Sequence, residues 1–518
     1  MANEFSNMWD RTDTKDSFQR NTQNMNFAFA DTETSEEADL IPDEEFSSNV
    51  IKPKPQTTGY EYDLAVIGSG PAGYTAAVNA SQLGAKVIMF EKEALGGLWL
   101  NSGCVPAKIY LKSADTLRSV KSASECGVTG GSGVSIDMPG LLSYKNSIVS
   151  KLTSYAARLL RSCRVRVEAG EASLKSAHEI VCRGRIYRVS KIILCGGSRI
   201  DRSVIPGSSH KGVWGNEDVF KATEIPSRLV VLSDNNEGCE IAATFAAFGS
   251  NVMLIGMGQR LLSDWDTQVA EAVGKALSEA GVKVHTGISV KEITDRNGSP
   301  YIITERGGVL CDKLLIATAR KPNLSFLGLL TDDIKTKNGA ISVNEYMETS
   351  VPGIYAVGDI TGQNSQTQAI YKMAKAAAEN AMGGKQEVSF MTEPVEIKTT
   401  LEAAYVGLTE EKAREIYGDG LITGFCPLSA NVRAILSGTT SGFVKVLAGR
   451  RHGEIYGVHI VGADASEMIA EPAALMQMEV TIHEVASDII HAHPTYSEAF
   501  AEACADALGK SLHLFKTG

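Results

Sequence analysis

The apolar and polar positions of this chain form a repeating pattern of short buried strands separated by helices. Six apolar runs of strand length lie at residues 64–67, 86–90, 192–194, 229–232, 251–256 and 314–316. Continuous apolar runs of this length are typical of parallel strands that are covered on both faces. Alanine-rich helical stretches lie between strands, and residues 141–160 form a long amphipathic segment. The pattern predicts an α/β protein built from βαβ units.

The first of these units carries the residues of a dinucleotide site. Gly68, Gly70 and Gly73 form a G-x-G-x-x-G sequence between the first strand and an alanine-rich helix. Glycines at these positions let backbone N–H groups and the helix N-terminus approach a pyrophosphate closely. Glu91 ends the second strand, where a carboxylate can accept hydrogen bonds from an adenosine ribose. We therefore interpret residues 64–91 as a dinucleotide-binding unit rather than a simple glycine-rich turn.

The segment that follows indicates which dinucleotide is bound. Residues 96–108 read GGLWLNSGCVPAK, which resembles the redox-active segment of the flavoprotein disulfide reductases, most closely dihydrolipoamide dehydrogenase. The resemblance implies that Cys104 faces the flavin and that Lys108 pairs with Glu240 beside it. Trp99 stands where the family has its outer cysteine, whose thiol exchanges with the substrate disulfide. We expect Cys104 to be unpaired, covered by the Trp99 indole, and lowered in pKa.

Three later segments also resemble flavin-domain sequences of this family. Residues 195–198 (CGGS) resemble its A-T-G-S turn, residues 314–323 its strand ending in G-R-x-P-N, and residues 349–359 its flavin-ribityl motif. The resemblance implies FAD as the cofactor. The residues expected to contact it are Gly68, Gly70, Pro71, Ala72, Gly73, Glu91, Lys92, Gly97, Gly103, Cys104, Lys108, Gly197, Ser198, Arg320, Gly358 and Asp359.

The second βαβ unit, which binds NAD in the family, departs from the pattern. Its three glycine positions hold Ser233, Asn235 and Gly238. Asp234 and Glu237 lie at the first turn of the following helix, where two carboxylates would satisfy the helix dipole and repel a pyrophosphate. Gly256 ends the next strand and offers no carboxylate to a ribose. NAD(H) is therefore not expected to bind, although the unit should still fold.

The last ~125 residues resemble the dimerisation domain of the family, which implies a homodimer. Within them, residues 491–498 read HAHPTYSE. The resemblance implies that His493 is the acid/base for the substrate thiol and that Glu498 orients it. An imidazole held by a carboxylate is a common device for proton transfer near neutral pH. The expected catalytic residues are Cys104, Lys108, Glu240, His493 and Glu498; no metal site is expected.

Composition narrows the setting of the protein. The 518 residues are 43% hydrophobic and 21% charged, values typical of a globular domain. The net charge of −11 argues against nucleic acid as a partner. No apolar run reaches the ~18 residues of a membrane span. The N-terminus lacks a signal-peptide pattern, and nine scattered cysteines without C-x-x-C spacing indicate reduced thiols, so a cytoplasmic location is expected.

Residues 1–60 differ in composition from the rest of the chain. Eight acids and no Lys or Arg lie between Asn21 and Ile51. Such a segment is typical of a disordered acidic tail. The alternative is an arm that docks on a partner protein, with Phe27, Phe29 and Phe46 as anchors.

Together these features predict a glutathione-reductase-like fold, in which two Rossmann-like dinucleotide-binding domains precede a C-terminal α+β dimerisation domain. The expected segments are a tail (1–60), an FAD-binding domain in two parts (61–210 and 334–392), a degenerate NAD-binding-like domain (211–333) and a dimerisation domain (393–518). Three functions fit. The first is an FAD-dependent redox protein that uses one thiol and a non-nicotinamide partner. The second is a non-catalytic FAD-stabilised scaffold, as in a lipoyl-type complex. The third is an ordinary dihydrolipoamide dehydrogenase, which Trp99 and the second glycine loop oppose.

Overall fold

The computed structural model describes residues 59–201, 203, 205–318 and 320–515. The acidic segment that we interpret as a tail or docking arm therefore lies outside the described residues, except for its last two positions. Among the described helices, none combines the length and the apolar character needed to cross a membrane.

The first Rossmann-like domain is built on a seven-stranded sheet with the order β3-β2-β1-β6-β5-β4, and β19 pairs with β6. Its strands are β1 (Tyr62–Ile67), β2 (Val87–Glu91), β3 (Arg166–Ala169), β4 (Ala172–Ser176), β5 (Glu179–Cys182), β6 (Arg185–Leu194) and β19 (Ile354–Ala356). Strands β3, β2, β1, β6 and β19 are parallel, whereas β4 and β5 are antiparallel additions. The sheet therefore includes a strand, β19, that follows the second domain in the chain.

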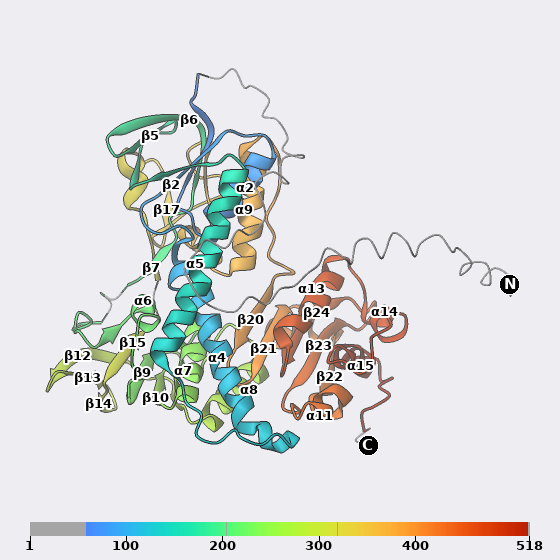
Figure 1. The fold of residues 1–518 in the computed structure, drawn as a ribbon. Coiled ribbons are helices and arrows are strands. Elements are labelled where there is room, and N and C mark those ends of the chain that lie inside the picture. The colour runs from blue at the N-terminus through green and yellow to red at the C-terminus, as the bar shows by residue number, and fades with distance from the viewer. Residues whose placement is uncertain (1–58, 202, 204, 319, 516–518) are drawn as a thin grey trace, which may run out of the picture. The chain divides into compact units, whose positions relative to one another are not determined.

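Burial explains why the strand prediction succeeds here. Leu64, Ala65 and Val66 of β1 are fully buried, because helices cover one face of the sheet and other segments cover the opposite face. Helices α2 (Pro71–Gln82) and α9 (Thr367–Ala381) pack side by side on this sheet (Figure 1). The amphipathic segment at 141–160 is the core of α5 (Met138–Ser162), as its spacing predicts.

Between the strands of the first domain lie the elements that carry the thiol. They are α3 (Gly97–Asn101), α4 (Cys104–Ser122) and η1 (Ala123–Cys126). Two small ribbons complete the region, one of β7 (Ser198–Ile200) with β16 (Arg320–Pro322), the other of β17 (Thr336–Lys337) with β18 (Ala340–Ile341). The β7–β16 ribbon links the end of β6 to the end of the second domain.

The second domain repeats the parallel arrangement on a smaller scale. Its sheet has the order β11-β10-β9-β15-β8 and all its pairings are parallel. The strands are β8 (Val213–Trp214), β9 (Arg228–Leu232), β10 (Asn251–Ile255), β11 (Lys283–His285) and β15 (Lys313–Ile316). The helices are α6 (Asn216–Val219), α7 (Asn236–Phe248) and α8 (Thr267–Glu279), and an antiparallel sheet contains β12 (Val290–Arg296), β13 (Ser299–Thr304) and β14 (Gly307–Leu310). The unit keeps the Rossmann-like strand–helix–strand order β9–α7–β10 that its apolar pattern predicts.

The C-terminal domain is an antiparallel sheet with helices, the α+β arrangement expected from the sequence. Its strands, in the order β20-β21-β24-β23-β22, are β20 (Pro394–Lys398), β21 (Glu402–Gly407), β22 (Leu421–Pro427), β23 (Phe443–Gly449) and β24 (Ile455–Val461). Its helices are α10 (Glu410–Tyr417), α11 (Val432–Leu436), α12 (Ala465–Met468), α13 (Ala470–Gln477), α14 (Ile482–Ser487) and α15 (Glu498–Ala507). The predicted fold class is confirmed.

A buried ion pair joins this sheet to the second domain. Lys445 of β23, which is 3% exposed, donates from Nζ to Asp266 Oδ1 at 2.6 Å and to Glu410 Oε2 at 3.1 Å. Asp266 also caps α8 by accepting a hydrogen bond from the backbone N–H of Gln268. Both charges are therefore compensated in the interior, as burial requires.

Candidate functional site

The glycine loop between β1 and α2 has the shape that a pyrophosphate requires. Gly68 has a φ of +100°, and a Cβ there would overlap the carbonyl oxygen of Cys195. A Cβ on Gly73 would overlap the carbonyl oxygen of Gly68, so the start of α2 packs directly on the loop. A Cβ on Gly70, by contrast, would meet no atom within 4 Å, and no side chain caps the N-terminus of α2. Free N–H donors beside open space fit a phosphate group.

Glu91 is held at the end of β2 by this loop. Its Oε2 accepts hydrogen bonds from Ser69 N at 2.9 Å and from Ser69 Oγ at 2.5 Å, and its Oε1 accepts one from Glu93 N at 2.8 Å. The carboxylate is thus positioned beside the open glycine loop, as an adenosine ribose requires. Lys92 instead pairs with Glu171 at 3.8 Å, an exposed contact that does not involve the loop.

Three elements that are distant in sequence meet at the end of β6. Ser198 Oγ donates to Asp359 Oδ2 at 2.5 Å, and Arg320 Nε donates to Ser198 Oγ at 2.8 Å. Asp359 begins η4 (Asp359–Thr361) after Gly358, whose φ of +83° favours glycine. Gly197 also has a positive φ, +63°. The result is a group of hydroxyl, carboxylate and guanidinium that fits the polyol chain of a flavin.

Taken together, the open glycine loop, the carboxylate at the end of β2 and the Ser198–Asp359–Arg320 group fit FAD. When bound there, FAD supplies a two-electron redox centre.

The thiol segment begins beside this loop. A Cβ on Gly97 would lie 3.2 Å from the Cα of Gly70, and one on Gly103 would lie 2.9 Å from the carbonyl oxygen of Leu98, so both turns need glycine. Cys104 is the first residue of α4 and its thiol is free, as are all nine cysteines.

The pKa of Cys104 is raised and not lowered, contrary to the expectation from the sequence. Desolvation by the surrounding protein is the largest cause of the raised pKa. The charge of Lys108 lowers it, but three carboxylates, those of Glu240, Glu396 and Glu237, oppose that effect. Glu396 lies on β20, which no local pattern places near Cys104. The sequence could therefore not reveal whether the pKa of Cys104 is raised or lowered. Cys104 is therefore expected to carry a proton near neutral pH.

Trp99 is partly buried on α3. Its indole meets the ring of Tyr371 edge to face, with the centroids 6.2 Å apart. Tyr371 lies on α9, and the Cys104 thiolate contributes to raising its pKa after desolvation. The sequence did not indicate this aromatic pair, since the segments are 272 positions apart. Cys104 is exposed, so the expectation that the Trp99 indole covers it is wrong for this chain; the indole packs against Tyr371 instead.

Lys108 and Glu240 form the ion pair that the resemblance implies. Lys108 Nζ donates to Glu240 Oε1 at 2.7 Å and lies 3.7 Å from Glu396 Oε1. The same Glu240 oxygen accepts a hydrogen bond from Lys398 N at 2.9 Å. Burial lowers the pKa of Lys108, but Glu240 and Glu396 raise it, and the net pKa is raised. Lys108 is thus a permanent cation, and its role in catalysis stays a prediction.

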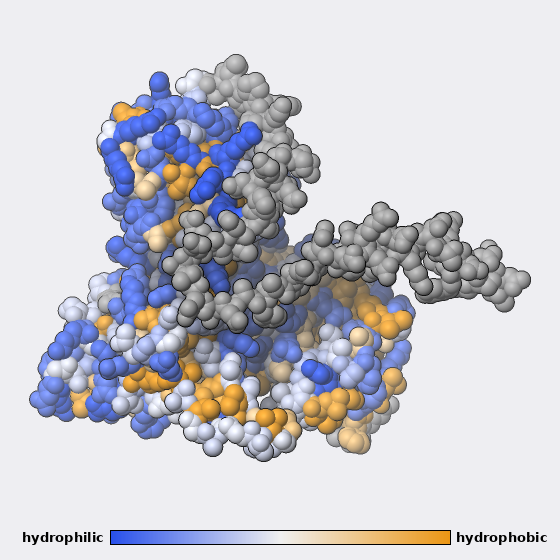
Figure 2. Space-filling model, viewed as in Figure 1, coloured by the Kyte–Doolittle hydropathy of each residue, from blue (hydrophilic) through white to orange (hydrophobic). Residues whose placement is uncertain are grey.

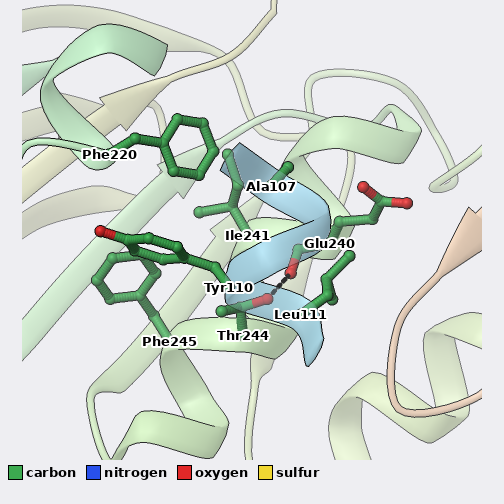
Figure 3. Close-up of a pocket in the computed structure, with 8 residues that line it drawn as sticks. All are labelled: Ala107, Tyr110, Leu111, Phe220, Glu240, Ile241, Thr244 and Phe245. Atoms are coloured by element: carbon green, nitrogen blue, oxygen red, sulfur yellow. Dashed lines mark hydrogen bonds between the residues drawn. The ribbon is translucent and has the colours of Figure 1, made fainter. Parts of the chain in front are cut away.

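The packing of α4 on α7 sets the distance between Lys108 and Glu240. Figure 3 shows a small pocket between the helices, where rings of Tyr110, Phe220 and Phe245 gather on one side. The Glu240 carboxylate points away from these rings. Thr244 Oγ1 donates to the Glu240 carbonyl oxygen at 2.8 Å, so this hydroxyl is hydrogen-bonded within α7.

The second glycine-like loop, residues 233–238, is filled by its own side chains. Asn235 Oδ1 accepts a hydrogen bond from Gly238 N at 3.1 Å and so caps the N-terminus of α7. Ser233 Oγ and Asn235 Nδ2 both donate to the carbonyl oxygen of Ala317, at 3.1 and 3.0 Å. Ser233 is fully buried against Gly238. The helix end therefore has a partner within the protein.

The two acids of this loop do not act as the sequence suggested. Asp234 turns away from the helix end, and its Oδ2 accepts a hydrogen bond from Gly258 N at 2.9 Å. Glu237 accepts a hydrogen bond from Asn216 Nδ2 and lies 3.9 Å from Arg320 Nη1. The correction has a physical reason, since an amide oxygen two or three residues before the N–H groups reaches them better than either carboxylate does. The Asn235 signal was present in the sequence, because Asn is among the preferred N-cap residues.

Glu237 has a raised pKa. Desolvation is the largest cause, and Glu240 and Asp359 raise it further, whereas Arg320 and Asn216 lower it. The carboxyl connects α7 to the Ser198–Asp359–Arg320 group, which the sequence did not indicate.

The histidine segment forms the expected local pair. His493 Nδ1 lies 2.9 Å from Glu498 Oε1, and Thr495 N donates to the other Glu498 oxygen at 2.8 Å. His493 is 64% exposed, so within one chain its imidazole faces solvent. Burial raises the pKa of Glu498, but the hydrogen bonds of Thr495 and His493 outweigh it and the net pKa is lowered. His491 pairs instead with Glu471 at 2.8 Å.

Among the described residues, no group of three or more His, Cys, Asp or Glu side chains is arranged to hold a metal ion.

This geometry defines a flavoprotein with Rossmann-like domains, a thiol at the start of a helix and a separate C-terminal sheet domain. Residues 62–381 match the family model described as pyridine nucleotide-disulphide oxidoreductase, and residues 394–504 match the dimerisation domain of that family. The chain belongs to this family.

Among its relatives are proteins named dihydrolipoyl dehydrogenase. One from Bacillus subtilis (strain 168) is 35% identical over 464 residues, covering 87% of this chain and 99% of the relative. One from Thermus scotoductus is 35% identical over 463 residues, covering 88% and 99%. The fold matches that of LpdA from Mycobacterium tuberculosis (TM-score 0.78, 24% identity, 85% of this chain and 99% of that one) and of the HOCl-induced flavoprotein disulfide reductase RclA from Escherichia coli (TM-score 0.77, 24%, 86% and 99%).

Proposed function

We propose that this protein is an FAD-dependent oxidoreductase that works with the single thiol of Cys104 and exchanges electrons with a partner other than NAD(H). The observation that carries the proposal is the self-capped loop 233–238. A pyrophosphate at the start of α7 would have to displace the Asn235 side chain from Gly238 N. It would also lie near Glu237, and the side chain of Ser233 fills the space that a glycine would leave open.

The retained parts support a redox role more than a purely structural one. The Lys108–Glu240 pair is formed at a partly buried position, where charges are costly to keep without a use, and the exposed His493–Glu498 pair is formed as well. The proposed residue roles follow the family. Cys104 faces the flavin, Lys108 and Glu240 adjust the charge beside it, and His493 with Glu498 moves a proton at the substrate.

The test is anaerobic flavin reduction of the purified holoprotein. NADH and NADPH are expected to leave the flavin oxidised over minutes, whereas a small dithiol or a one-electron donor reduces it. A control reduction with dithionite shows that the flavin is accessible. Rapid bleaching by micromolar NADH would refute the proposal and favour an ordinary dihydrolipoamide dehydrogenase, the activity for which the 35%-identical relatives are named.

A second candidate is a non-catalytic scaffold stabilised by FAD. The raised pKa of Cys104 favours it, because a protonated thiol is a poor nucleophile and a poor charge-transfer donor. The two candidates differ in a simple measurement. A scaffold gives no turnover with any dithiol and artificial acceptor, while its flavin content still raises the unfolding temperature.

We also propose that the active unit is a homodimer. The dimerisation domain exposes apolar side chains on α11, where Val432, Ile435 and Leu436 are 43%, 56% and 68% exposed. Figure 2 shows apolar surface over this part of the molecule, at the lower right of the view. A second copy of the chain would cover such a surface and bring a second His493 to the assembly. Sedimentation of the holoprotein at twice the chain mass is the expected result.

A further inference from the structure

Glu237 occupies a position that the loss of a nicotinamide site does not by itself explain. It is the second residue of α7 and lies on the side of that helix that faces the flavin-binding group. An apolar residue there would suffice to fill the loop. Instead, the chain places a carboxyl whose side chain is 32% exposed, so that it can exchange protons with solvent.

A short chain of contacts connects this carboxyl with the residues that fit the flavin. Glu237 Oε2 lies 3.9 Å from Arg320 Nη1. Arg320 Nε lies 3.8 Å from Asp359 Oδ2 and donates to Ser198 Oγ at 2.8 Å. Arg320 therefore stands between two carboxylates and can balance the charge of Glu237 when that group loses a proton.

The elements around Glu237 contribute charged or titratable groups, and α6 contributes the uncharged amide of Asn216. From α4 comes Cys104; from its own helix, Glu240, which is paired with Lys108; from β16, Arg320; from η4, Asp359. The pKa of Glu237 is raised because it is desolvated and because Glu240 and Asp359 repel its charge. A carboxyl of this kind changes its protonation closer to neutral pH than an ordinary glutamate does.

We propose that Glu237 is the proton-exchange residue of the flavin site, supplying the proton that accompanies electrons delivered by a one-electron donor. The inference rests on the proposed function, since NADH would deliver its own hydrogen as a hydride. A donor that carries only electrons leaves the proton to the protein.

The reaction balances with a named donor. With FAD bound, its reduction to FADH⁻ would take two electrons from two reduced viologen radical cations and one proton, which the Glu237 carboxyl would supply. The products are two viologen dications and the Glu237 carboxylate. Arg320 then faces this carboxylate, and solvent returns the proton through the exposed edge of the side chain.

The experiment measures the rate at which reduced methyl viologen reduces the holoprotein flavin across pH in a stopped-flow instrument. In the wild type, the rate is expected to fall as pH rises through the pKa of Glu237, above the ordinary range of a glutamate. In Glu237→Gln, that break disappears, and the rate at low pH falls about a hundredfold, the usual contribution of a positioned acid. Glu237→Asp keeps a carboxyl and is expected to retain a break.

Glu217→Gln is the matched control, because Glu217 lies on neighbouring α6 and its side chain is 64% exposed. It should leave both the rate and the break unchanged. A Glu237→Gln protein with the wild-type rate and the wild-type break overturns the proposal.

A second variant guards against misfolding of Glu237→Gln. Asn216 Nδ2 donates to the carboxylate of Glu237, so Asn216→Ala removes a donor that favours the charged form and should move the break to higher pH. A break that stays in place overturns the proposal. Infrared difference spectra of the FAD-free proteins, wild type minus Glu237→Gln, should show a protonated carboxyl band that disappears at high pH. The absence of this band at every pH also overturns the proposal.

Reduction of the wild-type flavin by NADH is measured separately. Rapid reduction would refute the proposed function, while the viologen result would still decide the role of Glu237.

Discussion

The two glycine-type loops of this protein begin from the same βαβ plan and end with opposite chemistry. In the first, α2 starts without a side-chain cap, and its first turn contains no acid. In the second, Asn235 caps α7 and Glu237 lies in the first turn. The first helix end offers its N–H donors to a ligand, whereas at the second the Asn235 side chain already takes the N–H of Gly238.

This difference teaches that a Rossmann-like unit can keep its fold after its ligand site has closed. The helix dipole and the unpaired N–H groups need a partner in either case. In a binding site that partner is a phosphate, and in the closed loop it is an amide side chain. Packing of the helix on its sheet is unaffected, because Ala242 and Ala243 are as deeply buried in α7 as Ala76 and Ala77 are in α2.

The largest expected effect comes from closing the first loop by force. Gly73→Ala would place a methyl group on the carbonyl oxygen of Gly68. It should cost about 3 kcal/mol of unfolding free energy, as overpacking does, and abolish FAD binding. Urea unfolding and the ratio of flavin to protein absorbance measure both. Gly274→Ala on α8 is the control, since that site faces open space and should lose neither flavin nor stability; full flavin content in Gly73→Ala would contradict the assignment of this loop.

Opening the second loop should produce the next largest effect. The redesign replaces Ser233 and Asn235 with Gly, Asp234 and Glu237 with Ala, and Gly256 with Glu. A Cβ at 256 would lie 3.2 Å from the Asp234 Cβ, which Ala keeps, so the backbone there has to shift by a few tenths of an ångström. Affinity for NADH should rise about a hundredfold, or ~2.7 kcal/mol. Calorimetry checks this, with the same design retaining Gly256 as control; an unchanged affinity would mean that the loop is not what excludes NADH.

A single substitution can make the first loop resemble the second. Gly70→Asn supplies a cap to α2 at a position where φ is −62° and an added Cβ would meet no atom within 4 Å. The FAD-free protein should become slightly more stable, while FAD binds about tenfold more weakly because the amide occupies the N–H donors. Fluorescence titration of the FAD-free protein measures the affinity. Equal affinity in the variant and the wild type would show that the donors at this helix end do not hold the cofactor.

The reverse change removes the cap of the second loop. Asn235→Ala should cost about 1 kcal/mol, since Gly238 N loses its acceptor. FAD content should not change, which separates this variant from those of the first loop. Denaturant unfolding at constant flavin saturation is the measurement, and a loss of flavin would show that the two loops are coupled.

The smallest effect is a pH dependence specific to the second loop. The folded-state pKa of Glu237 lies above its ordinary value of 4.5, so the folded state binds more protons than the unfolded state between these two values. The stability of the FAD-free protein should therefore decrease as pH rises through that window. Glu237→Gln should remove this part of the slope and be relatively more stable at pH 7. Unfolding curves between pH 4 and pH 8 test the sign, and a slope identical to that of the wild type would contradict the raised pKa.

The apolar pattern predicted the elements of both domains closely. The segment at 141–160 proved to be the core of a 25-residue helix, and the strand expected at 86–90 is β2, one residue later. These predictions hold because a parallel strand buried on both faces and a helix covering a core leave no freedom in where apolar residues lie. The chemical residue types could also be identified, since each motif is short: the glycines and the thiol lie within residues 68–104 and the histidine motif within residues 491–498.

Contacts between distant segments could not be predicted. The raised pKa of Cys104 depends on Glu396 of β20, and the setting of Glu237 depends on Arg320 and Asn216. Asn235 competes with two acids for the same helix end, and only its geometry decides the outcome.

By itself, the sequence determined the fold class, the open first glycine loop and the absence of a second thiol at position 99. These are local properties, because burial periodicity, glycine backbone freedom and residue identity are all written within a few tens of residues. The tertiary structure alone decided the charge balance at Cys104 and the partners of Arg320. Those depend on electrostatic interactions and hydrogen bonds over a few ångströms between residues that lie 30 to 300 positions apart, as between Cys104 and Glu396.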